Sequence, residues 1–149
     1  MRNLLFKFIF IAIIIRVVIY IVVNQDFFTR KFDLAYISDT YSKSQYVLGP
    51  ASKNGIGDDG LYTFAGYYYL FQKGDVSSVN FEHPPLGKYL IGLSILIFKN
   101  ENIINIIYFI ILLITTYRLG QILLKDRLLS LISAGILASD PLFLDNLIR

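Results

Sequence analysis

The residues best suited to chemistry lie in one short stretch, Asn80–Gly92, which reads NFEHPPLGKYLIG. It contains the only histidine of the chain, His83, together with Glu82 and Lys88. The first of the two prolines restricts His83 to extended geometry, and the second suits the first turn of a helix, where its missing N–H is not needed. We therefore expect a helix to begin here, with Glu82 and His83 at its N-terminal end. Histidine, lysine and a helix N-terminus can all stabilise negative charge that gathers on a leaving group.

A second candidate lies upstream, where Asp58 and Asp59 belong to a glycine-rich segment. Gly55–Gly60 is expected to form a turn that leads into a helix over about Leu61–Gln72, whose apolar residues recur at helical spacing. Acidic residues before a helix commonly cap its free N–H groups, which contributes about 0.5–2 kcal/mol. A carboxylate can instead act as a general base that takes a proton from a hydroxyl acceptor. Capping is the simpler explanation of the pair alone; with the downstream histidine and lysine in the same loop, we prefer the general base.

Composition indicates a membrane protein. The 149 residues are 55% hydrophobic, and their apolar runs are separated by polar blocks. The net charge is only +3 and several basic residues flank apolar runs, so we expect membrane orientation rather than a nucleic-acid partner. The chain has no cysteine, which excludes disulfides, thiolate zinc sites and thiolate-held iron–sulfur clusters. With one histidine and scattered acids, no dedicated zinc site is expected.

Three apolar segments are expected to cross the membrane, over about residues 4–23, 103–123 and 128–144. The first is long enough to cross roughly 30 Å of hydrocarbon, and Arg2 and Lys7 favour a cytoplasmic N-terminus. A signal peptide is the competing interpretation of this run, but no small-residue cleavage site follows it. Arg16 lies well inside the first span, so it should face other helices and a partner.

The polar and aromatic segment 24–102 is expected to be a long non-cytoplasmic loop. Within it, Pro85–Phe98 is apolar but too short to span the membrane comfortably. If this segment crosses, Arg118, Lys125 and Arg127 lie outside; if it lies in the membrane plane or re-enters, they lie in the cytoplasm. The positive-inside rule favours the second topology. We therefore expect an all-α membrane protein whose first loop carries in-plane helices.

The stretch His83–Lys88 resembles the His-Pro-Pro-Leu-Gly-Lys motif of the protein O-mannosyltransferase family, polytopic enzymes of the GT-C superfamily. Asp58 and Asp59, followed by Gly-Leu-Tyr, resemble the acidic pair that this family carries upstream in the same loop. The resemblance extends from about Leu4 to the last residue. Family members are several hundred residues long and cross the membrane many times. Three spans are too few to enclose a lipid-donor cavity. The resemblance therefore implies that residues 1–149 are a single N-terminal segment of a GT-C helical bundle.

The resemblance implies a membrane glycosyltransferase that transfers mannose or a similar sugar from a polyprenyl (dolichyl-type) phosphate donor to a hydroxyl acceptor on the non-cytoplasmic side. The acceptor would belong to a protein, a lipid or a glycan. The enzyme would be a multi-pass protein of the cell membrane, or of the endoplasmic reticulum membrane in a eukaryote. Whether this segment is active by itself is left open.

The resemblance also implies roles for individual residues. Asp58 and Asp59 become the catalytic carboxylates, although Asp59 stands where the family commonly has Glu. The candidates for binding the donor phosphate or the substrate are Glu82, His83, Lys88 and Arg149. No cofactor is expected; a divalent ion between the aspartates, as in oligosaccharyltransferase relatives, is left open. The family's arginine near the start of the next span is missing from Glu101–Asn105, and Arg149 lies about one residue out of register with the arginine that follows the family's Asp-Pro pair.

Simpler explanations remain for these residues. His83 could end a turn, and Lys88 could extend its side chain to lipid head groups. A rival function is a non-catalytic membrane subunit or a transporter fragment, in which Arg16 and Asp140 would be the working intramembrane charges. Only the enzyme hypothesis makes the carboxylate of Asp58 indispensable.

Overall fold

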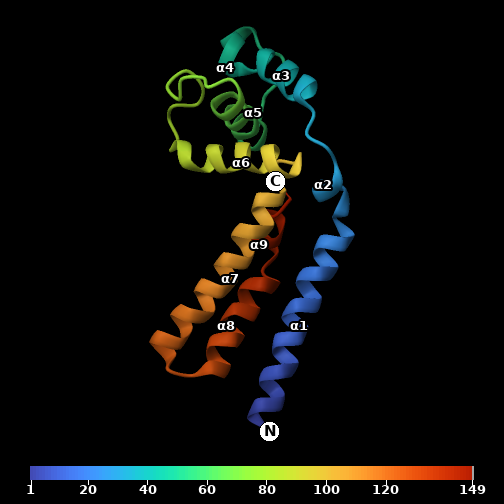
Figure 1. The fold of residues 1–149 in the computed structure, drawn as a ribbon, viewed down its shortest axis with the longest axis vertical. Coiled ribbons are helices and arrows are strands. Elements are labelled where there is room, and N and C mark those ends of the chain that lie inside the picture. The colour runs from blue at the N-terminus through green and yellow to red at the C-terminus, as the bar shows by residue number, and fades with distance from the viewer. Residues whose placement is uncertain (149) are drawn as a thin grey trace. The chain divides into compact units, whose positions relative to one another are not determined.

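The computed structural model describes residues 1–148, which form helices and no strand (Figure 1). The helices are α1 (Arg2–Val23), α2 (Gln25–Thr29), α3 (Leu34–Ser42), α4 (Gln45–Leu48), the 3₁₀ helix η1 (Gly49–Ala51), α5 (Asp58–Phe71), α6 (Pro85–Phe98), α7 (Ile103–Leu124), α8 (Arg127–Ser139) and α9 (Pro141–Asp145). The all-α class is therefore confirmed for the described chain. The chain divides into two compact units: unit 1 contains residues 1–29 and those from Asn105 onward, and unit 2 contains residues 30–104.

Two helices, α1 and α7, are long and apolar enough to cross a membrane. Their bounds nearly coincide with the first two expected spans. No residue of α1 is buried in the chain, whereas the core helix of a soluble protein buries at least one apolar face. The exposed apolar surface of α1 is therefore suited to a lipid environment.

The third expected span is not one continuous helix. It is interrupted at Asp140, whose backbone is extended (φ −68°, ψ 121°) and whose carboxylate accepts a hydrogen bond from the Leu142 N–H at 2.8 Å. Pro141 lacks the N–H that a continuous helix would use. The segment expected over residues 128–144 is thus α8 followed by α9, and its crossing of the membrane stays a prediction.

Unit 1 is held together by side chains of α1, α7, α8 and α9. The buried cluster consists of Phe109, Ala138, Leu144 and Leu147. A Cβ at Gly120 of α7 would lie 3.0 Å from the Ser130 Cα atom, so this glycine lets α8 approach α7 closely. At the far end of α7, the Arg2 guanidinium pairs with the Asp126 carboxylate. The N-terminal end of α1 and the connection between α7 and α8 therefore lie at the same end of unit 1.

Unit 2 is built around the crossing of α5 and α6 at two glycines. A Cβ at Gly66 would overlap the Lys88 carbonyl and lie 2.9 Å from the Gly92 nitrogen, so the two backbones are in contact. The core beside this crossing consists of Ile56, Leu61, Ala65, Tyr69 and Val79. Only glycine provides this closeness, because any side chain at either position would push the helices apart.

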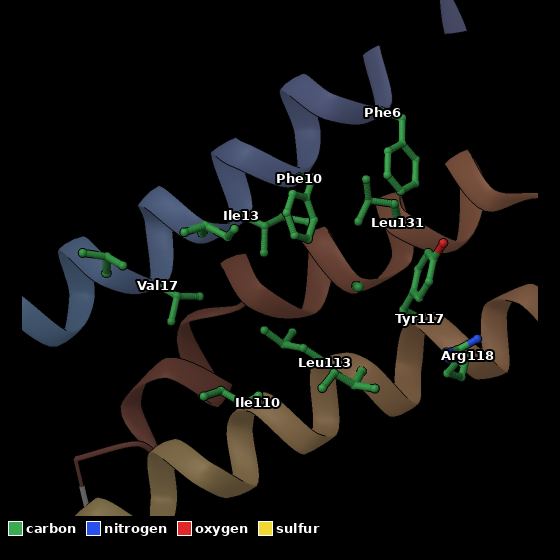
Figure 2. Close-up of a pocket in the computed structure, with 13 residues that line it drawn as sticks. Phe6, Phe10, Ile13, Val17, Ile110, Leu113, Tyr117, Arg118 and Leu131 are labelled. Atoms are coloured by element: carbon green, nitrogen blue, oxygen red, sulfur yellow. The ribbon is translucent and has the colours of Figure 1, made fainter. Parts of the chain in front are cut away.

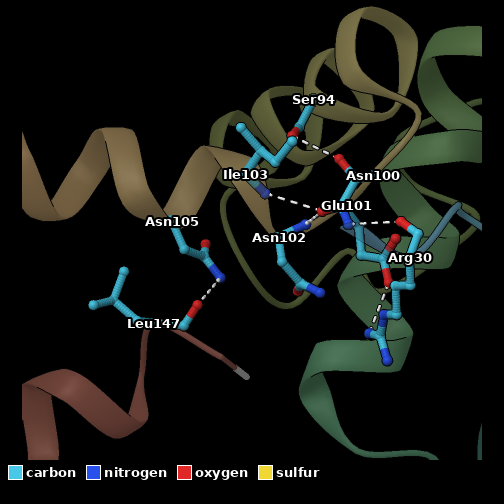
Figure 3. Close-up of polar contacts among 8 residues, drawn as sticks. All are labelled: Arg30, Ser94, Asn100, Glu101, Asn102, Ile103, Asn105 and Leu147. Atoms are coloured by element: carbon cyan, nitrogen blue, oxygen red, sulfur yellow. Dashed lines mark hydrogen bonds and ion pairs between the residues drawn. The ribbon is translucent and has the colours of Figure 1, made fainter. Parts of the chain in front are cut away.

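The ends of unit 2 are joined by polar contacts around Asn100 (Figure 3). The Asn100 side-chain oxygen accepts hydrogen bonds from the N–H groups of Asn102 at 2.6 Å and Ile103 at 3.1 Å, where α7 begins. Its amide nitrogen donates to the Arg30 carbonyl at 2.8 Å. The Arg30 guanidinium also pairs with the Glu101 carboxylate at 2.8 Å. These contacts close residues 30–104 into one unit, whose bounds nearly match the loop expected over residues 24–102.

Candidate functional site

The two aspartates of the acidic pair lie in the first turn of α5, because the helix expected from Leu61 already begins at Asp58. The N-cap residue of α5 is Gly57, which has no side chain to cap the helix. Among residues 1–148 no other side chain makes a capping hydrogen bond at this end of α5. The Asp59 carboxylate folds back over Gly57, where a Cβ would lie 2.6 Å from its Oδ1 atom. Both aspartates are exposed. Side-chain capping therefore does not explain the pair, although the helix dipole still favours two acids at this end.

Lys88 is buried, with 2% of its surface exposed, so it does not extend to lipid head groups as the simpler explanation held. Its ammonium group donates to the His83 carbonyl at 2.9 Å and to the Asn80 carbonyl. Burial lowers the pKa of Lys88. An ammonium has three N–H donors, so one remains for another acceptor. Lys88 thus anchors the loop that carries His83.

Tyr62 connects the acidic pair with this loop. It lies one helical turn after Asp58, and its ring centroid is 5.7 Å from that of His83, with the planes tilted by 58°. The Lys88 Nζ atom lies 5.7 Å from the centre of the Tyr62 ring. Burial, the charge of Asp58 and the nearby Tyr46 all raise the pKa of Tyr62. Asp58, His83 and Lys88 are therefore gathered around one aromatic ring.

Tyr62 entered the sequence analysis only as the tyrosine that follows the acidic pair, with no chemical role of its own. Its position four residues after Asp58 on a helix is the signal that places the two side chains on the same face. Its contact with His83 could not be foreseen, because it depends on how the loop before α6 folds back over α5.

The arrangement offers complementary chemical groups. Asp58 is an exposed carboxylate that can accept a proton, while the His83 ring is exposed and can donate a hydrogen bond to an anion. The Tyr62 phenol carries a hydroxyl that can donate as well as accept, so it too is a donor. A site with one proton acceptor and several donors suits a reaction that moves a proton from one substrate while charge develops on another.

Two predicted site residues, Glu82 and Arg149, remain. Glu82 is exposed in the loop before α6, and Arg149 lies outside the described residues. Arg30 pairs with Glu101 at 2.8 Å, just before the segment in which the sequence lacks the expected arginine. An arginine from an earlier part of the chain thus lies beside the start of α7.

In the part of the chain that the structure describes, no three side chains from His, Asp and Glu lie close enough together to hold a metal ion. Asp58 and Asp59 supply two carboxylates from adjacent residues, and a divalent ion usually takes additional ligands from protein, substrate or water. The divalent ion left open by the sequence thus remains untested.

Comparison of the chain with known protein families, with curated proteins and with solved structures gave no match. The fold defines an all-helical chain with two helices that could cross a membrane. The resemblance to protein O-mannosyltransferases therefore depends on the residues of the two motifs alone.

Proposed function

We propose that the protein is a membrane glycosyltransferase that transfers mannose or a similar sugar from a polyprenyl phosphate to a hydroxyl acceptor on the non-cytoplasmic side. The observation that carries this proposal is the convergence of Asp58, His83 and Lys88 around Tyr62. Tyr62 lies on the same helix face as Asp58 and its ring packs against His83, so one side chain connects the two motifs.

The reaction is a single displacement at the anomeric carbon of the sugar. The acceptor oxygen forms a bond to that carbon while the bond to the phosphate oxygen breaks, and the acceptor proton passes to the Asp58 carboxylate. Negative charge gathers on the departing polyprenyl phosphate, where the exposed His83 donates, while the buried Lys88 holds the loop that carries His83. Asp59, next to the base, orients the acceptor hydroxyl.

The ion pair between Arg2 and Asp126 supports the topology in which α6 does not cross the membrane. It brings the N-terminus to the same end of unit 1 as the connection between α7 and α8. If α6 crossed as a span between α1 and α7, those two segments would lie on opposite faces of the membrane. Three cationic side chains lie near this end, Arg118, Lys125 and Arg127, and by the positive-inside rule they indicate that it faces the cytoplasm. Residues 24–102 then lie on the non-cytoplasmic side. The membrane is the cell membrane or, in a eukaryote, the endoplasmic reticulum membrane.

The decisive experiment is Asp58→Asn, assayed as sugar transfer from a polyprenyl phosphate donor in membranes that carry the protein. Asparagine keeps the size of the side chain but cannot accept the proton, so transfer should fall by about 10²–10⁴-fold. Asp59→Asn should cost less, because it removes only acceptor orientation. Asp39→Asn is the matched control, since this exposed carboxylate pairs only with Lys43 on the surface. Near-normal turnover by Asp58→Asn at normal expression would rule out the catalytic role.

A second candidate, a non-catalytic membrane subunit or transporter component, is favoured by one observation. Arg16 of α1 and Asp140 line the same recess between α1 and α8. Charges within a membrane region commonly mark functional positions. Under this alternative Asp58→Asn is silent, whereas Arg16→Gln and Asp140→Asn abolish assembly or transport. Loss of function in Asp58→Asn with normal function in the other two variants would exclude it.

A further inference from the structure

A groove runs between α1 and α7 with α8 as its floor (Figure 2). Its volume is about 490 Å³, and its walls are almost entirely apolar. Phe6 and Phe10 of α1 face Ile114 of α7 across it, while Leu131 and Ala134 of α8 lie beneath. These walls would accept a hydrocarbon chain.

One end of this groove adjoins a basic recess. The recess is lined by Arg2, Arg118, Lys125 and Arg127, and its volume is about 610 Å³. Phe6, Tyr117 and Arg118 line both hollows, so they adjoin at Arg118. Among the described residues that line the recess, Asp126 is the single acid, and its carboxylate pairs with Arg2. Within residues 1–148 no carboxylate pairs with the other three cations. Arg118 donates to the Gln121 Oε1 atom at 3.4 Å, and its remaining N–H groups can donate to an anionic ligand.

We propose that groove and recess together bind an anionic phospholipid, with one acyl chain between α1 and α7 and the phosphate at Arg118. The combination of an apolar channel with a cationic end matches the two parts of such a lipid. This site uses none of the residues assigned to sugar transfer, so it stands or falls independently of that activity.

Charge also argues against another transmembrane helix as the occupant. By the positive-inside rule, the ends of helices at a cytoplasmic face carry lysine and arginine, which would be repelled by Arg118, Lys125 and Arg127. The lipids of that leaflet carry the opposite charge, and each nearby Lys or Arg contributes about 1 kcal/mol to their attraction, which is about five-fold in affinity.

The absence of native tryptophan makes a direct test available. Ile114→Trp places the chain's single tryptophan in the groove, where it can be excited apart from the tyrosines, and bromine atoms on a lipid acyl chain quench it on contact. The protein is reconstituted in nanodiscs of phosphatidylcholine in which either brominated phosphatidylglycerol or brominated phosphatidylcholine is the minor component. We expect the reporter to show at least a five-fold preference for phosphatidylglycerol. Phe10→Trp, a conservative aromatic change on the opposite wall, should report the same preference and guards against misfolding of the first variant.

Two controls separate a site from general attraction to a basic protein. Leu112→Trp lies on the opposite face of α7, since two residues turn a helix by about 200°, and it should show only the background preference. Arg118→Gln in the reporter protein should lower the preference by about five-fold, whereas the charge-matched Lys53→Gln should leave it unchanged. The proposal is overturned by equal preferences at positions 114 and 112, by equal effects of Arg118→Gln and Lys53→Gln, or by reporters that neither lipid quenches.

Discussion

Replacing Lys88 by methionine tests whether this lysine anchors the loop that carries His83. Lys88 is 2% exposed, and its ammonium donates to the carbonyls of His83 and Asn80. Hydrogen bonds to a charged group contribute about 1.5–3 kcal/mol each. The desolvation that lowers the pKa of Lys88 offsets part of this. Methionine keeps most of the apolar stem, so we expect the free energy of unfolding of unit 2 to fall by about 2–4 kcal/mol.

The assay is thermal unfolding followed by near-ultraviolet circular dichroism. A loss of this size lowers the melting temperature by at least about 8 °C for a domain of this size. Lys53→Met, at an exposed lysine, should leave it within a degree or two. If Lys88 instead only contacts the donor phosphate, Lys88→Met raises the donor KM and leaves unfolding unchanged. Unchanged unfolding of Lys88→Met would therefore refute the anchoring role.

Three further predictions follow from the fold. Ser78→Cys should be labelled from outside intact cells by an impermeant maleimide, and Lys125→Cys only after permeabilisation. The chain has no native cysteine, so either label is specific. Labelling of Lys125→Cys in intact cells would exclude an in-plane α6. Gly66→Val should destabilise unit 2 by about 1–3 kcal/mol or more, because the valine side chain would overlap the backbone of α6. Gly87→Ala is the control, since its Cβ meets no atom within 4 Å and should be neutral. Equal melting temperatures of the two variants would contradict the close crossing. Burial raises the pKa of Tyr69 above its ordinary value of 10.0, so the phenol of the unfolded chain loses its proton first. The free energy of unfolding should therefore fall as the pH rises through about 10. If the free energy of unfolding of Tyr69→Phe falls with pH in the same way, this phenol is not responsible.

Helix positions could be predicted where run length or proline determines them. The bounds of α1 and α7 followed from the length of their apolar runs, and Pro85 marked the first residue of α6. The start of α5 was missed because glycine and aspartate are also the residues of turns. Ile56 before α5 and Leu61 in its first turns are both buried in the unit 2 core, a tertiary contact that the local sequence does not show. The break at Asp140 was not predicted, although Pro141 lacks the N–H with which a helix would continue.

The site could be predicted by residue type but not by geometry. The motifs identified Asp58, His83 and Lys88, and the structure gathers them around Tyr62. The burial of Lys88 could not be foreseen, because it requires the preceding loop to turn back over its ammonium group. That turn includes Asn80 with a φ of +50°, a left-handed conformation that the local sequence does not announce.

The division of the chain into two units has a consequence for the order of folding. Unit 2 is continuous in sequence, so its helices can pack as soon as residues 30–104 have left the ribosome. Unit 1 is discontinuous, because α1 is made first and its partner α8 comes only after all of unit 2. Bringing α1 and α8 together closes a long loop, and a folded unit 2 shortens the flexible part of that loop and so reduces its entropic cost. During synthesis α1 is therefore without its packing partner until α8 (Arg127–Ser139) has been made, and its exposed apolar side chains are suited to a lipid environment during that time.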